Sequence, residues 1–381
     1  MFASMPCTRR CRDAAATILV LVLLLPAIAL AHKVSDSYLT IGPVRDGEAE
    51  LRWDIALRDL DLALDLDADG DRRLRWGELR ARLPEIMAHA AAALAFDQGE
   101  CPVAFHTLGI ETRSDGNYLA MGAPLRCPAG GPTSVGYRLL GDLDPTHRGL
   151  LRIDRGDGTT AALSLDPNGG EQRLPTAGGS GLAAFFADGL DHILIGYDHL
   201  LFLLCLMLPA VLRRGRDGWR LVDAPRDALL PLLKTVTLFT IAHSVTLALA
   251  SLEIVRLPPR WVEAAIAVSI VLAAVHNLRP RWPGAEPALA FGFGLVHGFG
   301  FANVLAGLSL PPSGFALALL GFNLGVEAGQ LLVVATATLV LLTLGGRRHV
   351  ARVLMPTASF AAIAIGGIWA VERVFDLAII S

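Results

Sequence analysis

Six apolar blocks in the second half of the sequence constrain its fold more than any other feature. They run over residues 184–211, 228–252, 260–278, 286–309, 314–344 and 350–375. A helix that crosses the hydrocarbon core of a bilayer needs about 20 predominantly apolar residues. The chain of 381 residues is 53% hydrophobic and only 18% charged, and its mean hydropathy is +0.50. Residues 179–381 are therefore predicted to form a membrane all-α bundle of about six transmembrane helices.

Arginines alternate between the loops that join these blocks. The loops after the first, third and fifth blocks are rich in arginine, whereas the other two hold only Arg256 and Arg260. Cytoplasmic loops of membrane proteins carry an excess of Lys and Arg. The arginine-rich loops are therefore predicted to face the cytoplasm, and the chain before the first block to lie outside. In a bacterium with two membranes, this places a multi-pass protein in the inner membrane with its N-terminal domain in the periplasm.

Residues 1–31 have the pattern of a secretory signal peptide. Arg9, Arg10 and Arg12 precede an apolar stretch. The stretch ends on a small-x-small pattern at Ala31, where signal peptidases cleave. Cleavage after Ala31 is therefore expected, with an uncleaved first helix as the alternative.

Residues 32–178 predict a small β-rich domain outside the membrane. Stretches such as Ser37 to Ile41 and Ala49 to Leu57 alternate apolar and polar residues. Gly, Pro and Asp separate such stretches, as in a small antiparallel β-sandwich. Cys101 and Cys127 both lie in this exported part, where an oxidising compartment favours a disulfide between them over two free thiols.

An acidic loop over residues 67–78 interrupts the β-rich pattern. Its spacing matches the oxygen ligands of an EF-hand loop from the first position to the twelfth. The ligands would come from Asp67, Asp69, Asp71, the carbonyl of Arg73, and Glu78. Arg72 occupies the sixth position, where an EF-hand has Gly for its sharp turn. The loop predicts a structural calcium ion, with a merely acidic turn as the alternative.

Ionisable side chains lie inside the apolar blocks. Such residues are costly within a membrane, and by default they indicate an ion pathway or a binding site. His199, His243 and His297 fall near the middle of their blocks, and so do two carboxylates, Asp198 and Glu327. Because imidazole suits nickel, cobalt, zinc and copper better than hard cations, these residues predict an intramembrane site for a divalent transition metal.

Helix geometry predicts a path toward this site. His192 and His199 are seven residues apart, so in a continuous helix they share a face with about 10 Å between them. His192 is therefore expected to be an outer metal ligand that captures the ion first. Because sequence neighbours on a helix point about 100° apart, Asp198 is expected to orient an imidazole other than that of His199. The path is completed by Asp191, Asn323 and Gln330.

The segment from His192 to His199 resembles the first-helix signature of the HupE/UreJ family of membrane proteins, His-Pro-x-x-Gly-x-Asp-His. His192, Gly196, Asp198 and His199 match this signature, and Ile193 stands in place of the proline. The resemblance to that family's second subgroup, which carries an extracytoplasmic N-terminal domain, extends over Phe239–Leu247, Phe291–Ala302 and Phe322–Gln330. It implies a role in nickel or cobalt uptake.

These features predict an inner-membrane permease or binding protein for a divalent transition metal, nickel or cobalt before zinc. The sequence has no nucleotide-binding motif, so transport would be passive or coupled to another ion. One alternative is an intramembrane zinc hydrolase that uses the same histidines with Ser244. Another is a membrane sensor or assembly factor without transport. The expected partners are the metal ion and the lipid bilayer, with no nucleic acid.

Overall fold

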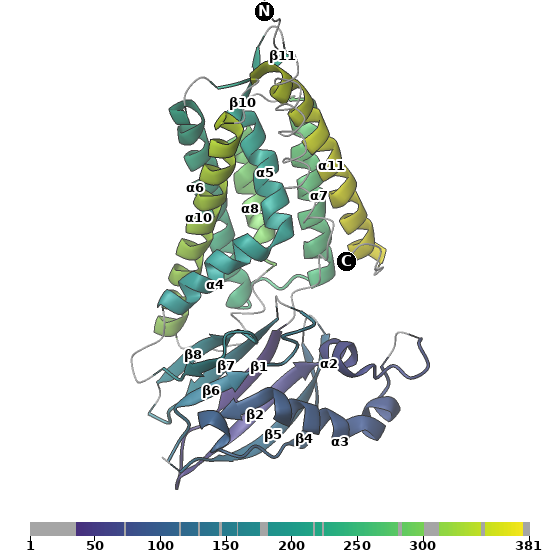
Figure 1. The fold of residues 1–381 in the computed structure, drawn as a ribbon, viewed down its shortest axis with the longest axis vertical. Coiled ribbons are helices and arrows are strands. Elements are labelled where there is room, and N and C mark those ends of the chain that lie inside the picture. Colours follow the sequence, from purple (N-terminus) through teal and green to yellow (C-terminus); the bar gives the residue numbers. More distant parts are fainter. Residues whose placement is uncertain are drawn as a thin grey trace, which may run out of the picture. The chain divides into compact units, whose positions relative to one another are not determined.

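A computed structural model of the chain describes residues 36–71, 74–113, 116–128, 130–144, 147–157, 159–175, 182–215, 218–222, 225–280, 284–300, 312–343 and 347–375. The predicted signal peptide, residues 1–31, lies outside these residues. The chain folds as two compact units, an N-terminal unit that includes residues 36–175 and a helical unit that includes most of the chain from Phe186 onward. Figure 1 shows the strands of the N-terminal unit and the helices of the helical unit.

The N-terminal unit is built on a six-stranded sheet. Its strand order is β4-β5-β2-β1-β7-β8, and all neighbours are antiparallel except β1 and β7. The strands are β1 (Asp36–Ile41), β2 (Glu48–Ala56), β4 (His106–Arg113), β5 (Gly116–Arg126), β7 (Arg148–Asp154) and β8 (Thr160–Leu165). The prediction of a β-rich region is confirmed, but the prediction that it is wholly antiparallel is wrong. A long stretch of chain separates β1 from β7, so no tight hairpin forces these two strands to run in opposite directions.

A smaller sheet, two α-helices and a short 3-10 helix complete the described part of this unit. The sheet has the antiparallel order β3-β6-β9. Its strands are β3 (Leu94–Phe96), β6 (Ser134–Tyr137) and β9 (Glu171–Arg173), and the helices are α2 (Leu57–Leu64), α3 (Trp76–Ala93) and the short 3-10 helix η2 (Asp97–Gly99). Leu51, Trp53 and Ile55 of β2 are fully buried. Because alternate residues of a strand point to the same face, these three side chains form one row of the core.

A chain of buried hydrogen bonds crosses this core. The indole N–H of Trp53 donates to the hydroxyl of Ser37 over 2.9 Å, and that hydroxyl lies 2.8 Å from the hydroxyl of Tyr137. The Tyr137 hydroxyl in turn bonds Nε2 of His147, and none of the four side chains is more than 1% exposed. Because an indole only donates, every group is satisfied when each hydroxyl donates onward and a neutral His147 accepts at the end. Burial lowers the pKa of His147 to about 4, so the neutral form persists above that pH.

The helical unit contains seven helices in the residues that the structure describes. They are α4 (Leu182–Ile195), α5 (Tyr197–Val211), α6 (Pro225–Ser251), α7 (Pro259–Leu278), α8 (Glu286–His297), α10 (Pro312–Thr343) and α11 (Arg347–Phe375). A hairpin of β10 (Leu212–Gly215) and β11 (Gly218–Leu221) follows α5.

The lengths and hydropathies of these helices make the chain a multi-pass membrane protein. Four helices, α6, α7, α10 and α11, are each long and apolar enough to cross a membrane, and the bent pair α4–α5 is a fifth candidate span. The sequence predicted six spans. The difference lies at α8, which has only 12 residues, and residues 301–309 of its predicted block lie outside the described part of the chain.

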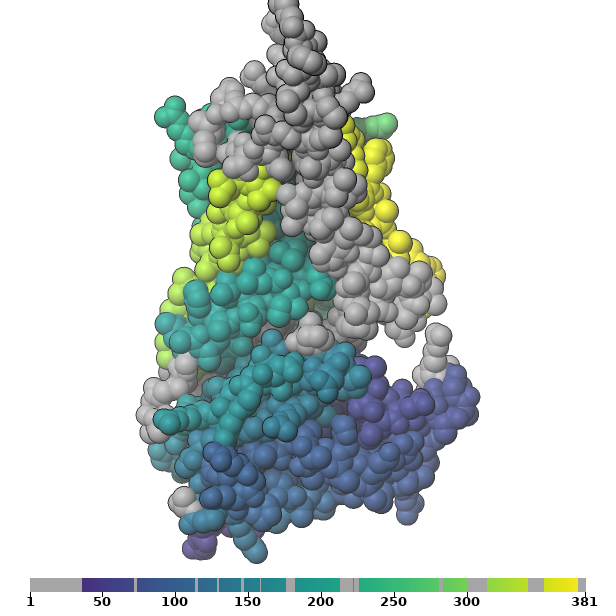
Figure 2. Space-filling model, in the orientation of Figure 1, coloured from purple at the N-terminus to yellow at the C-terminus, as the bar shows by residue number. Residues whose placement is uncertain are grey.

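Glycines let α4 and α10 approach closely. A Cβ atom on Gly189 would lie 2.0 Å from the carbonyl oxygen of Phe322, and one on Gly325 would lie 2.0 Å from that of Phe186. The two helices lie side by side, teal and yellow-green in Figure 2. Small residues at such crossings are typical of helix packing in membranes. The crossing places the Phe322 ring 5.3 Å from the ring of His192.

Candidate metal centre

A break at Gly196 determines how the first two histidines meet. The helix α4 ends at Ile195, and α5 begins at Tyr197 at an angle of 71° to it. Gly196 has φ −69° and ψ 95°, which is not helical, and a Cβ atom there would lie 2.5 Å from the carbonyl oxygen of His192. The rings of His192 and His199 are consequently only 4.5 Å apart between centroids. The prediction of two stations about 10 Å apart is wrong, because it assumed a continuous helix.

Three imidazoles from three helices converge at this break. His192 of α4, His199 of α5 and His243 of α6 each offer one ring nitrogen, and these nitrogens lie within 4.8 Å of one another. His243 is fully buried and His199 is 7% exposed. Imidazole nitrogens in such a group are the ligands that nickel, cobalt and zinc prefer. The three residues are hereafter called the histidine cluster.

Hydrogen bonds determine which ring nitrogen of two cluster members carries the lone pair. Nδ1 of His199 lies 2.9 Å from Oδ1 of Asp198, and Nδ1 of His243 lies 3.4 Å from Oδ1 of Asn323. Because carboxylate and amide oxygens accept, each Nδ1 donates a proton and each Nε2 keeps its lone pair. Both Nε2 atoms are buried without a hydrogen-bond partner among the described residues. A hydrogen bond on the far nitrogen is how proteins orient histidine ligands toward a metal.

Asp198 orients its own neighbour rather than a different imidazole. It lies in the first turn of α5, where its Oδ1 accepts both the backbone N–H of His199 at 2.8 Å and the ring Nδ1–H. The prediction of another partner for Asp198 is wrong. It treated the two side chains as diverging on a helix, whereas at a helix N-terminus the free backbone N–H groups draw the carboxylate back toward the next residue. Asp191, which directly precedes His192, is exposed on α4.

The fourth histidine lies beside the cluster. The ring of His297, at the end of α8, is 5.1 Å from that of His199. Its Nε2 lies 3.1 Å from the hydroxyl of Ser269 on α7, and that hydroxyl lies 2.6 Å from the carbonyl oxygen of Ile266. Since a hydroxyl has one proton and gives it to the carbonyl, Ser269 accepts from Nε2–H. Nδ1 of His297 then keeps its lone pair, and it has no partner among the described residues.

Ser269 was not predicted from the sequence as a site residue. Its signal was weak, since it is a single hydroxyl in the apolar run from Ala264 to Val275. Hydroxyls in helices commonly bond a carbonyl of the preceding turn, as Ser269 does here with Ile266. Its position near the middle of its block, like that of His297, was the one feature that could have indicated a role.

A polar row on α6 continues from the cluster. Thr237, Thr240 and His243 follow at three-residue steps, so they share one side of the helix with about 4.5 Å between levels. The Thr237 hydroxyl donates to Glu327 at 3.0 Å, and the Thr240 hydroxyl donates to Gln330 at 3.1 Å, both acceptors being on α10. The structure thus places Glu327 along this row and not within the converging group of ring nitrogens.

The acidic loop of the N-terminal unit brings three carboxylates together. Asp67, Asp69 and Asp71 each place one oxygen within 4.8 Å of the others. The guanidinium of Arg75 bonds Asp69 at 2.7 Å and also bonds Asp71. The carboxylate of Glu78 accepts from the backbone N–H of Arg75 at 2.8 Å, which caps the first turn of α3. Arg73, the predicted carbonyl ligand, lies outside the described residues.

The cysteines of the two units differ in state. Cys101 and Cys127 form a disulfide in the N-terminal unit, with 4.7 Å between their Cα atoms. Cys205 of α5 is a free, buried cysteine. It is 2% exposed within the apolar core of the helical unit, where it acts as a small packing side chain.

Comparison with known proteins assigns the family of the helical unit. A family model described as HupE / UreJ protein matches residues 170–373, just over half of the chain. No match was found among curated proteins. That family is associated with nickel and cobalt transport, which agrees with a group of imidazoles inside a helical bundle. The chain belongs to the HupE / UreJ family.

Proposed function

We propose that this protein is a permease for a divalent transition metal, nickel or cobalt, that binds the ion at the histidine cluster during its passage. One observation carries the proposal: ring nitrogens of His192, His199 and His243 converge from three helices. The lone pairs on Nε2 of His199 and His243 are left without a hydrogen-bond partner in the described chain. A buried polar atom without a partner is costly, and a bound cation removes that cost.

Charge near the cluster supports a cation as its occupant. Three neutral imidazoles leave the double charge of a metal ion uncompensated. Asp198 supplies a negative charge through its hydrogen bond to His199. Glu327 supplies a second one farther along the polar row of α6. Carboxylates at these positions lower the free energy of a dication in a low-dielectric interior.

The polar row supports passage rather than permanent binding. The row begins at His243 and continues through Thr240 and then Thr237 toward the N-terminal end of α6. The arginine-rich loop before α6 favours a cytoplasmic position for that end, because cytoplasmic loops carry an excess of Lys and Arg. We therefore propose that the ion enters from the periplasm, binds the cluster and leaves along α6, with Glu327 and Gln330 lining its exit.

The test is uptake of radioactive nickel by cells that express single variants. His199→Gln and His243→Gln should each lower uptake at least about tenfold, since each removes one ligand nitrogen. His276→Gln is the matched control, because His276 lies on α7 outside the converging group. Uptake that stays unchanged in His199→Gln would overturn the proposal.

The structure offers less support for an intramembrane zinc hydrolase than for a metal permease. The hydroxyl of Ser244, which that alternative places beside a zinc-activated water, donates instead to the carbonyl oxygen of Thr240 in its own helix at 2.7 Å. One zinc per chain that survives dialysis, without metal flux, would favour that alternative. A sensor or assembly factor would instead show neither flux nor turnover, but a protein that co-purifies with it.

We also propose that the acidic loop binds a structural calcium ion. Three carboxylates within reach of one cation are the basis for this proposal. The cationic group now bonded to Asp69 and Asp71 is Arg75. Calcium must displace this guanidinium, so the affinity of the loop depends on how strongly Arg75 competes.

A further inference from the structure

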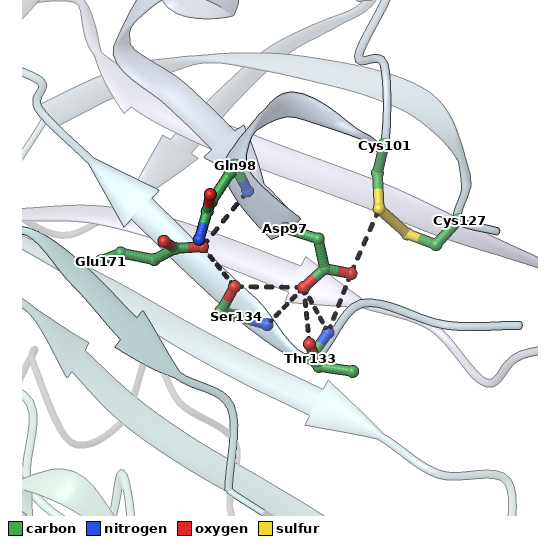
Figure 3. Close-up of a disulfide and its surroundings, with 7 residues drawn as sticks. All are labelled: Asp97, Gln98, Cys101, Cys127, Thr133, Ser134 and Glu171. Carbon is green, nitrogen blue, oxygen red and sulfur yellow. Dashed lines mark hydrogen bonds between the residues drawn. A yellow bond between two sulfur atoms is a disulfide. The ribbon is translucent and has the colours of Figure 1, made fainter. Parts of the chain in front are cut away.

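A third group of potential ligands lies around the disulfide of the N-terminal unit, shown in Figure 3. Asp97, Cys101 and Cys127 each place one ligand atom within 4.8 Å of the others. We propose that reduction of this disulfide creates a binding site for one soft divalent metal ion of the zinc, cobalt or nickel class. Its ligands are the two cysteine thiolates and the Asp97 carboxylate. This site lies outside the helical unit and does not depend on the transport proposal.

The Asp97 carboxylate is held in place independently of the disulfide. Its Oδ1 accepts the backbone N–H groups of Thr133 and Ser134 at 2.9 and 2.8 Å and the Thr133 hydroxyl at 2.7 Å. Its Oδ2 points toward Sγ of Cys101 at 3.4 Å (Figure 3), and among the described residues its one other contact is the longer one from Thr133 N–H at 3.2 Å. Burial alone would raise the pKa of Asp97, but these hydrogen bonds together lower it, so the carboxylate is charged and available as a ligand.

A disulfide sulfur cannot satisfy the oxygen that faces it. In the oxidised state Sγ of Cys101 carries no proton, so the contact with Oδ2 of Asp97 contains no donor. In the dithiol state the Cys101 S–H donates to that oxygen. A metal ion between the thiolates and the carboxylate satisfies all three groups at once. The reduced state therefore suits this carboxylate better than the oxidised state does.

The backbone keeps both cysteines near Asp97 after the sulfur–sulfur bond breaks. Cys101 is tied to Phe96, at the end of β3, by an isolated bridge whose N–H···O distance is 3.4 Å. Cys127 directly follows β5, and its carbonyl oxygen accepts the N–H of Gly130 at 3.0 Å. The two side chains are only 2% and 8% exposed. Neither cysteine is free to swing into solvent on reduction.

The turn between Asp97 and Cys101 is anchored at a second point. Asp97, Gln98 and Gly99 all have positive φ angles, of 47°, 58° and 91°, a conformation that non-glycine residues adopt only when their surroundings impose it. The backbone N–H of Gln98 donates to Glu171 at 3.2 Å, and Glu171 also accepts from the Ser134 hydroxyl. These contacts hold the turn in place without help from the disulfide.

The chemistry of the switch balances with a dithiol reductant of the thioredoxin class. A donor thiolate attacks one sulfur of the disulfide to form a mixed disulfide, and the second donor thiol resolves it. Two electrons and two protons pass to the protein, which now carries two thiols, while the donor becomes a disulfide. Metal binding then releases the two thiol protons. Soft thiolates select zinc, cobalt or nickel over calcium and magnesium, and bound metal stabilises the dithiol state by mass action.

Cobalt titration of the purified full-length chain in detergent tests this site. The background variant carries Cys7→Ser, Cys11→Ser and Cys205→Ala, so that only Cys101 and Cys127 can supply thiolates. The protein is reduced with a water-soluble phosphine, freed of reductant without oxygen, and titrated with Co²⁺. A thiolate-to-cobalt charge-transfer band that saturates at one ion per chain is expected after reduction and not before.

Two variants separate the role of the carboxylate from that of the fold. Asp97→Asn keeps an oxygen for Thr133 and Ser134 but loses the charge, and it should lower cobalt affinity at least about tenfold. Asp157→Asn is the matched control, because Asp157 also accepts a backbone N–H and a hydroxyl, both from Thr159, away from the disulfide. An absent band, an unchanged affinity in Asp97→Asn, or loss of the β-sheet circular dichroism on reduction would each overturn the proposal.

Discussion

Buried histidines occur in both units, and they differ in what their ring nitrogens meet. In the N-terminal unit, Nε2 of His147 ends a chain of hydrogen bonds through Tyr137. In the helical unit, Nε2 of His199 and Nε2 of His243 have no hydrogen-bond partner among the described residues. Burial alone therefore does not distinguish a structural histidine from a ligand. An oriented ring whose second nitrogen is left without a partner, inside a converging group, does.

The two environments also place their charges differently. His147 belongs to a network that a neutral imidazole completes, so adding a proton disturbs it. In the histidine cluster, Nδ1 of His199 and Nδ1 of His243 bond the acceptors Asp198 and Asn323, and the lone pairs on their Nε2 atoms have no hydrogen-bond partner among the described residues. A positive charge is therefore excluded from the first environment and accommodated in the second. Four predictions test this contrast.

Loss of the helix break should have the largest effect. In Gly196→Ala the new Cβ would lie 2.5 Å from the carbonyl oxygen of His192 and 3.0 Å from Nδ1 of His199. The α4–α5 junction must then shift, and the cluster disperses. Nickel uptake per unit of membrane protein should fall roughly a hundredfold. Gly292→Ala is the control, since a Cβ there meets nothing within 4 Å, and equal uptake by the two variants would contradict the cluster's role.

Acid should destabilise the N-terminal unit through His147. Its pKa is about 4 in the folded unit, against 6.5 for a histidine side chain in an unfolded chain, so the unfolded chain takes up the proton first. The contribution of a neutral His147 to the free energy of unfolding is complete above pH 6.5 and is lost as the pH falls from 6.5 to about 4. The loss amounts to about 3 kcal/mol, measurable as protection of the β2 amides from hydrogen exchange after correction for the intrinsic rates.

His147→Gln supplies the comparison for that measurement. Glutamine does not titrate in this range, so the variant should be less stable at pH 7 but should lose less stability on acidification. The wild-type protection must therefore fall more steeply with acid than that of His147→Gln. Parallel pH profiles for the two proteins would assign the acid effect to other groups.

Ser269→Ala should have a smaller effect on metal binding. Without its hydroxyl, Nε2–H of His297 loses its acceptor, and the lone pair of Nδ1 is no longer fixed. Metal affinity and the apparent KM for uptake should worsen about tenfold. Ser359→Ala is the matched control, because that serine is fully buried on α11 and its hydroxyl has no partner among the described residues. Equal affinities in the two variants would remove His297 from the site.

The sequence predicted the architecture well because hydrophobic pattern is a local property. Apolar runs long enough for a bilayer identified α6, α7, α10 and α11, and alternation identified strands such as β1 and β2. The break at Gly196 could not be predicted in the same way, because the run from residue 184 to 211 is apolar apart from Asp188 and its two Asp–His pairs. A glycine in such a run is compatible with a straight helix or a bent one.

Residues of the site were predictable by type but not by partner. His192, His199, His243 and His297 stand out because ionisable groups are rare in membrane spans. Asn323 was predicted only to line a path, whereas the structure places it against Nδ1 of His243. Such pairings depend on the crossing of α6 and α10, which no local spacing encodes. Partner choice is therefore a tertiary property even where ligand identity is not.

The smallest expected effect concerns the acidic loop, whose carboxylates also test whether converging groups that already have a partner bind a cation more weakly. Here the converging groups are already paired, since Arg75 bonds Asp69 and Asp71. Exposed ion pairs contribute little, so Arg75→Gln should raise calcium affinity only about threefold to fivefold. Calcium titration by calorimetry of the purified chain measures this. Arg82→Gln is the control, because Arg82 pairs with Glu85 on α3 outside the loop. If Arg75→Gln bound calcium no more tightly than Arg82→Gln, the guanidinium would not be competing with the ion, and the loop would be an acidic turn closed by its own arginine.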